Sequence, residues 1–87
     1  MTQYSKAIGD KAQRALLFSE GLHVLSGELS AMAGFVSDMG ADREVLELRW
    51  LAGDVGTWSR QVYRTSEELR KLANRLRTLE EQQEERA

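Results

Sequence analysis

The residues that could carry chemistry in this chain are one histidine, a row of serines and a few carboxylate pairs. His23 lies between Leu22 and Val24, and the positions three and four residues later hold Ser26 and Gly27. A lone histidine without cysteine or a paired carboxylate on the same helical face does not form a metal site. We therefore predict no metal site, and a packed or rim position for His23.

The serines and glycines predict neither a nucleophile nor a phosphate-binding loop. Serines recur at 19, 26, 30 and 37, but none follows a strand or stands beside a base. The stretch GDVG, residues 53–56, lacks the Lys-Ser/Thr pair of a P-loop and the strand that precedes a dinucleotide-binding loop. We therefore predict a protein that is not an enzyme and has no catalytic residue and no cofactor.

Composition narrows the class of protein further. A chain of 87 residues forms one domain, 1–87, and a domain this small buries little apolar surface by itself. The formal net charge of −2 gives no overall attraction to nucleic acid or anionic lipid, and the absence of cysteine excludes disulfides. The N-terminus lacks a signal-peptide layout, and no apolar run is long enough to span a bilayer. We expect a soluble, cytoplasmic protein with no membrane contact.

One break divides the chain into two helices. In SDMGADREV, residues 37–45, Gly40 suits the left-handed position after a helix, Asp42 can cap the next helix, and Glu44 is favourable in its first turn. There is no proline to interrupt either side. The sequence predicts an all-α antiparallel helical hairpin: helix 1 about 4–38, turn 38–42, helix 2 about 43–79, and a frayed acidic tail 80–87.

Apolar residues in both segments follow heptad spacing, which predicts a coiled-coil seam between the helices. The predicted seam comprises Ala15, Phe18, Leu22, Leu25, Leu29, Met32, Val36 and Met39 in the first helix, and Leu48, Leu51, Val55, Trp58, Val62, Thr65, Leu69, Leu72, Leu76 and Leu79 in the second. The heptad continues through WLAGDVGTW, residues 50–58, so this stretch is predicted to be helix. Trp58 is then predicted to lie in the seam, with Trp50, Gly53 and Gly56 outside it.

The first helix is too apolar for a hairpin that stands alone. Between residues 15 and 37 only Glu20 and Glu28 are charged, and apolar residues stand on several sides of the helix. We therefore predict a homo-oligomer, most simply a dimer in which two hairpins pair into a four-helix bundle; another protein covering helix 1 is the alternative. Small residues would allow close approach of another helix, and the predicted oligomer interface comprises Leu17, Val24, Gly27, Ala31, Gly34 and Phe35.

The outer face of the second helix is predicted to bind a protein partner. An exposed tryptophan beside small residues, with arginine and tyrosine nearby, is typical of an interface hot spot. The predicted partner-binding residues are Trp50, Gly53, Thr57, Arg60, Tyr63 and Arg64. Trp50 would equally suit a contact with the second copy of the chain.

Two other functions fit the sequence. The basic stretch 60–77 carries six basic residues against two glutamates, which is typical of helices that contact phosphate and would suit a nucleic-acid-binding protein. Glu67 and Glu68 can also pair with those bases, which would make the stretch an ordinary solvated face. A small inhibitor or regulator that blocks a macromolecular complex, such as a phage or mobile-element protein, would also be compact, acidic and free of sites. The function predicted first is a non-enzymatic protein–protein interaction module.

Overall fold

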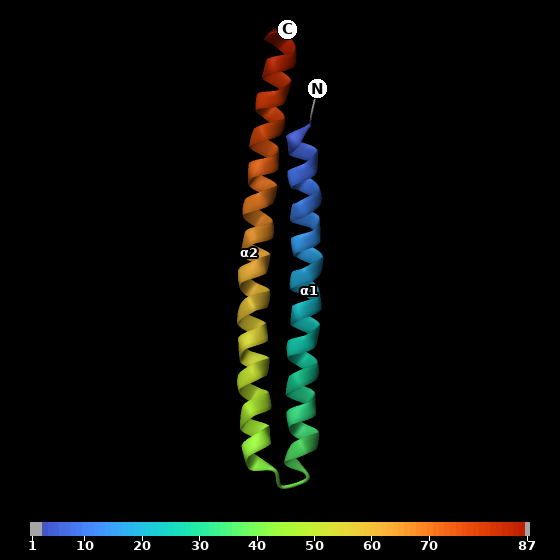
Figure 1. The fold of residues 1–87 in the computed structure, drawn as a ribbon, viewed down its shortest axis with the longest axis vertical. Helices are drawn as coiled ribbons and strands as arrows, with labels where there is room; N and C mark the ends of the chain where they lie inside the picture. The colour runs from blue at the N-terminus through green and yellow to red at the C-terminus, as the bar shows by residue number, and fades with distance from the viewer. Residues whose placement is uncertain (1–2, 87) are drawn as a thin grey trace.

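Two long helices make up nearly the whole hairpin (Figure 1). The computed structural model describes residues 3–86, with α1 over Tyr4–Ser37 and α2 over Asp42–Arg86. The helices run antiparallel and side by side, and the Cα atoms extend over 71 × 13 × 12 Å. The predicted all-α antiparallel hairpin is confirmed. α2 is the longer helix, and its C-terminal end projects past the start of α1 in Figure 1.

The turn between the helices closes on a glycine. Gly40 has a φ of 77°, in the left-handed region predicted for it. α2 begins at Asp42, and the Ala41 carbonyl accepts a hydrogen bond from the Val45 N–H at 3.1 Å. Asp42 therefore stands inside the first turn rather than in the capping position predicted for it. Its carboxylate remains favourable there, because the start of a helix carries partial positive charge.

Alternating small and aliphatic residues line the contact between the helices, at steps of three and four. We call these positions the seam. The small row recurs every seven residues and is buried or half-buried: Ser5, Ala12, Ser19, Ser26 and Ala33 in α1, and Ala52, Ser59, Ser66 and Ala73 in α2, with Val45 at its start. The aliphatic row also recurs every seven residues: Ile8, Ala15, Leu22, Leu29 and Val36 in α1, and Leu48, Val55, Val62, Leu69 and Leu76 in α2.

The sequence therefore predicted one row of the seam correctly and the other wrongly. The aliphatic row points inward as predicted from Ala15 and Leu48 onward. The second predicted row is exposed, and the residue that follows each of its helical members lines the contact instead: a small residue in every case except Glu80 after Leu79. The misplaced residues are Phe18, Leu25, Met32, Met39, Leu51, Trp58, Thr65, Leu72 and Leu79. The physical reason is that large side chains at these positions would hold the backbones apart, whereas serine and alanine let them approach.

Hydrogen bonds across the seam demonstrate this close approach. The Ser59 hydroxyl donates to the Ser19 carbonyl, and the Ser26 hydroxyl donates to the Ala52 carbonyl, both at 2.8 Å. A serine side chain is short, so each bond requires the two backbones to lie close together. A Cβ added to Gly56 would stand 3.3 Å from the Ser26 hydroxyl oxygen, so Gly56 faces α1 and is not outside the contact as predicted.

α2 remains helical to Arg86, although the sequence predicted fraying after Leu79. No helix among residues 3–86 combines the length and apolar character needed to cross a membrane.

Candidate interaction surfaces

Large apolar side chains lie mainly on the outside of the hairpin. The buried residues are serine, alanine and valine, and the most deeply buried of those described are Ser66 at 0 % and Ala33 at 1 % exposure. The exposed large apolar residues are Tyr4, Leu17, Phe18, Val24, Leu25, Met32, Phe35, Met39, Leu46, Trp50, Leu51, Trp58, Tyr63, Leu72 and Leu79. Single exposed apolar residues are common on monomers, but contiguous apolar surfaces mark interaction sites.

One set of these residues follows one flank of the seam. Each helical member stands directly before a position of the small row, or before Glu80, which continues that row in α2. We call this set the apolar strip: Phe18, Leu25, Met32 and Met39 from α1 and the turn, and Leu51, Trp58, Leu72 and Leu79 from α2. Phe18 is 61 % exposed and Trp58 is 53 % exposed. Thr65, at the same heptad position, is exposed, and its hydroxyl donates a hydrogen bond to the Gln61 carbonyl at 3.1 Å.

The two halves of the strip lie on one flank, and two pairs of their residues lie at matching levels. Ser19 stands opposite Ser59, because their hydrogen bond joins them. In an antiparallel pair, the residues that precede two facing positions fall on the same side of the contact. Phe18 and Trp58 are therefore neighbours along this flank. By the same reasoning, the bond from Ser26 to Ala52 places Leu25 beside Leu51.

A groove lies on the opposite flank. It encloses about 680 Å³ and is lined by Ser19, Glu20, His23 and Val24 from α1 and by Ser59, Arg60, Tyr63 and Arg64 from α2. His23 and Tyr63 come four residues after the bonded serines, whereas the strip residues come one residue before them. On a helix these two positions stand on either side of the serine. The groove and the strip therefore share the same serines and face opposite ways.

The groove brings part of the predicted partner-binding set together. Arg60, Tyr63 and Arg64 form its α2 wall, and Tyr63 is 48 % exposed. Arg60 donates a hydrogen bond to the Thr57 hydroxyl at 3.2 Å, which leads from the groove toward the rest of the predicted set. Neither arginine of the groove forms an ion pair within the described part of the chain. Both guanidinium groups are therefore available to an acidic partner.

The other predicted partner-binding residues lie nearer the turn. Trp50 is 69 % exposed, in agreement with its predicted position outside the seam. A Cβ at Gly53 would meet no neighbouring atom, so the surface is open there. The Thr57 hydroxyl bonds the Gly53 carbonyl at 3.0 Å. These three residues do not line the groove, so the predicted face of α2 continues beyond it.

The predicted oligomer interface lies along the outer side of α1, away from the seam. Leu17, Val24, Ala31 and Phe35 are exposed, and added Cβ atoms at Gly27 and Gly34 would meet no neighbouring atom. Only Val24 of this set lines the groove, and none belongs to the apolar strip. The apolar surface of α1 is thus wider than predicted. The sequence reading missed the strip because it placed the large residues of the strip inside the seam.

Two basic residues in the middle of the basic stretch 60–77 form ion pairs. Arg70 lies 3.4 Å from Glu67, and Lys71 lies 3.5 Å from Glu68. Both pairs are partly exposed and one helical turn apart, so each contributes little to stability. Their charges are nevertheless offset locally, unlike those of the two arginines in the groove.

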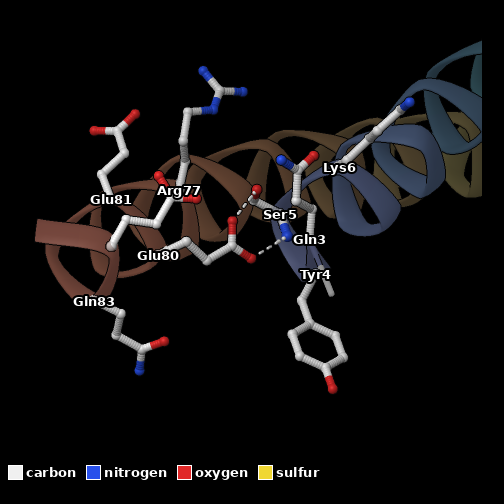
Figure 2. Close-up of a pocket in the computed structure, with 9 residues that line it drawn as sticks. Gln3, Tyr4, Ser5, Lys6, Arg77, Glu80, Glu81 and Gln83 are labelled. Atoms are coloured by element: carbon white, nitrogen blue, oxygen red, sulfur yellow. Dashed lines mark hydrogen bonds between the residues drawn. The ribbon is translucent and has the colours of Figure 1, made fainter. Parts of the chain in front are cut away.

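Glu80 caps α1 from the opposite helix. Gln3, the residue before α1, provides no side-chain cap. Instead, the Glu80 carboxylate accepts hydrogen bonds from the Ser5 hydroxyl at 2.6 Å and from the Ser5 N–H at 3.0 Å, and Figure 2 shows the carboxylate pointing at Ser5 while Tyr4 and Lys6 point away. The hydroxyl bond, followed by the N–H bond, holds the pKa of Glu80 below its ordinary value. This cross-helix cap ties the projecting end of α2 to the start of α1.

Residues 3–86 contain no group of three or more His, Asp or Glu side chains placed to hold a metal ion. His23 is exposed at the rim of the groove. Of the packed and rim positions predicted for it, the rim position is the one observed. Comparison of the chain with protein-family models, with curated proteins and with solved structures finds no match.

Proposed function

We propose that this protein is a non-enzymatic protein–protein interaction module that self-associates, with α1 supplying much of the contact, and that offers the outer face of α2 to a protein partner. The observation that carries the proposal is the distribution of side-chain size. Serine, alanine and valine are the buried residues of the seam, beside a half-buried aliphatic row, while phenylalanine, tryptophan, methionine and several leucines remain exposed. A chain that leaves its largest apolar residues outside its own core has them available for an interface.

The size of the domain supports self-association. Apolar burial contributes about 25 cal/mol per Å², and the seam buries mainly small side chains. Domains of this length seldom reach useful stability on so small a core and commonly gain the remainder from another subunit. A second copy offers the same exposed apolar surface, so a symmetric pair satisfies both copies at once.

The outer face of α2 supports a different contact. Trp50 supplies a large exposed aromatic surface, and Arg60 and Arg64 supply charge that no carboxylate of the described chain neutralises at ion-pair distance. Tryptophan, tyrosine and arginine are the residues most enriched at interface hot spots. We propose that a protein with an acidic or mixed surface binds here while the hairpins remain associated.

The mass in solution tests the self-association. Sedimentation equilibrium across a range of concentrations should give a species of twice the 9.9 kDa chain mass, with dissociation only on dilution. A 9.9 kDa monomer at high micromolar concentration that also unfolds in one cooperative thermal transition would refute the proposal, because the exposed apolar surface would then be tolerated without a partner.

Paired substitutions test the partner face separately. The protein would be captured from cells of its native host, and associated proteins identified by mass spectrometry. Trp50→Ala with Arg60→Ala should remove specifically associated proteins while the helical content and the mass of the free protein stay unchanged. If every association survives in the folded variant, the assignment of this face is wrong.

A further inference from the structure

We infer that a second copy of this chain covers the apolar strip, with the turns of both hairpins at the same end of the resulting four-helix bundle. This inference rests on the proposed self-association, and it specifies both the contacting surface and the orientation. The strip was not among the oligomer residues predicted from sequence. It becomes visible only when the small residues are seen to occupy the seam.

The strip has the area that a stable dimer needs. Its eight large apolar residues are between 37 % and 81 % exposed. With about 200 Å² for a fully exposed large side chain, the strip presents roughly 800 Å² of surface per hairpin, which is about what each partner buries in a stable interface. The strip runs along both helices, interrupted in α2 by the exposed Thr65, and an isologous contact places it against itself.

The levels of the residues favour turns at the same end. A two-fold axis along the rod sets α1 of one copy beside α2 of the other and keeps each residue at its own level. Phe18 and Trp58 share a level, so they would meet the second copy's Trp58 and Phe18 in one aromatic layer. The next layer toward the turn would combine Leu25 and Leu51 from both copies. Every helix would then be antiparallel to both of its neighbours, as in up-and-down bundles.

The opposite orientation loses much of this contact. Charged residues of α1 are concentrated near its start, at Lys6, Asp10, Lys11 and Arg14, whereas the part nearer the turn carries few charges. A full antiparallel overlap of two rods would set this polar end against the apolar half of the other copy. Sliding the copies until the apolar halves overlap would avoid that conflict, but it would leave Leu72 and Leu79 uncovered.

Distances between spin labels test the orientation. The chain has no cysteine, so a single introduced cysteine carries the only label. Asp38→Cys labels the turn and Lys6→Cys labels the open end; both side chains are exposed, and neither belongs to the strip. Turns at the same end predict label separations of roughly 20–30 Å for both variants, about two interhelical spacings plus the label arms.

The other outcomes are distinct. In an antiparallel dimer whose apolar halves overlap, the turn of each copy would lie beside Phe18 of the other. The turn labels would then be about 33 Å apart or more, at about 1.5 Å per residue from the turn to Phe18. The labels at the open ends would be farther apart still. A dimeric mass with these long distances would overturn the orientation and leave the proposed self-association standing. A monomeric mass would overturn both. The control for folding is that each labelled variant has the same mass in solution and the same helical content as the unlabelled protein.

Discussion

The two flanks of the hairpin differ although they share the same serines. On one side of Ser19 and Ser59 lies the apolar strip, where aromatic and aliphatic side chains stand without a charge between Phe18 and Leu25. On the other side lies the groove, where Arg60 and Arg64 face a wall that includes Glu20 and His23. An apolar surface without charge, as between Phe18 and Leu25, suits lasting association, and a charged flank with aromatic residues suits a partner that binds and leaves.

The seam explains how both flanks become available. A helix pair that packs on large residues buries them in its own core, where no partner can contact them. Here Ser26, Ser59 and Ser66 occupy positions in the contact, so the neighbouring large residues point to either side. The difference between the flanks therefore originates in the small row of the seam, and substitutions there and on each flank should have graded effects.

The largest effect is expected for Leu25→Asp in the strip. A carboxylate buried against the second copy without a partner costs several kcal/mol, so the dimer should dissociate, and the hairpin should lose most of its cooperative unfolding. The matched control is Val24→Asp, the adjacent residue on the groove side. Sedimentation should show a monomer for the first variant and a dimer for the second. The reverse result would move the self-association to the outer side of α1.

An intermediate effect is expected for Ser66→Leu in the seam. Ser66 is 0 % exposed, and its hydroxyl donates to the Tyr63 carbonyl at 2.6 Å. A leucine there overpacks the contact, and we expect it to lower the free energy of unfolding by about 1–3 kcal/mol. Ser66→Ala keeps the small size and should cost about 1 kcal/mol or less. Urea unfolding measures both variants, and equal losses would show that size is not what the seam requires.

A local and pH-dependent effect is expected at Glu80. Its pKa is lowered in the folded protein, so its stabilising contribution is complete above the ordinary carboxyl pKa of about 4.3 and is lost as the pH falls through the folded value. The protection of the Ser5 amide against exchange, measured relative to the intrinsic exchange rate at each pH, should fall over that acidic range. Glu80→Gln should abolish this pH dependence, and Glu84→Gln should preserve it. An unchanged profile in Glu80→Gln would show that another group controls the start of α1.

The smallest effect on the fold is expected in the groove. Arg64→Ala removes an exposed charge that forms no ion pair with the described chain, so the free energy of unfolding should change by about 0.5 kcal/mol or less. The dimer mass should also remain. A loss comparable to that of Leu25→Asp would show that the groove, and not the strip, carries the self-association.

The sequence was sufficient for the outline of the fold and insufficient for its seam. Gly40 and the absence of proline located the turn and allowed two long helices. The aliphatic row was predictable because its residues, such as Leu48, lie in the seam whether the second row is the large one or the small one. Counting apolar residues then favoured Trp58 over Ser59, because that count gives no weight to how closely two backbones can approach. The missed signal was the recurrence of serine or alanine at every seventh residue.

The candidate surfaces were predictable in the same partial way. Arg60, Tyr63 and Arg64 share one face of a helix because they are three and four residues apart. Their convergence with His23 and Val24 depends on the register between the helices, and a heptad pattern does not fix that register. The exposure of Trp50 followed from its place outside the heptad. That of Trp58 did not.

Fluorescence quenching of the two tryptophans tests whether a second copy covers the apolar strip. Trp58→Phe leaves Trp50 as the only tryptophan, and Trp50→Phe leaves Trp58. Both residues are more than half exposed on the hairpin itself, so acrylamide reaches both tryptophans in an isolated chain. If a second copy covers the strip, Trp58 should be protected at high protein concentration and become quenchable on dilution, while Trp50 should be quenchable throughout. Equal quenching of both tryptophans at every concentration would contradict the account.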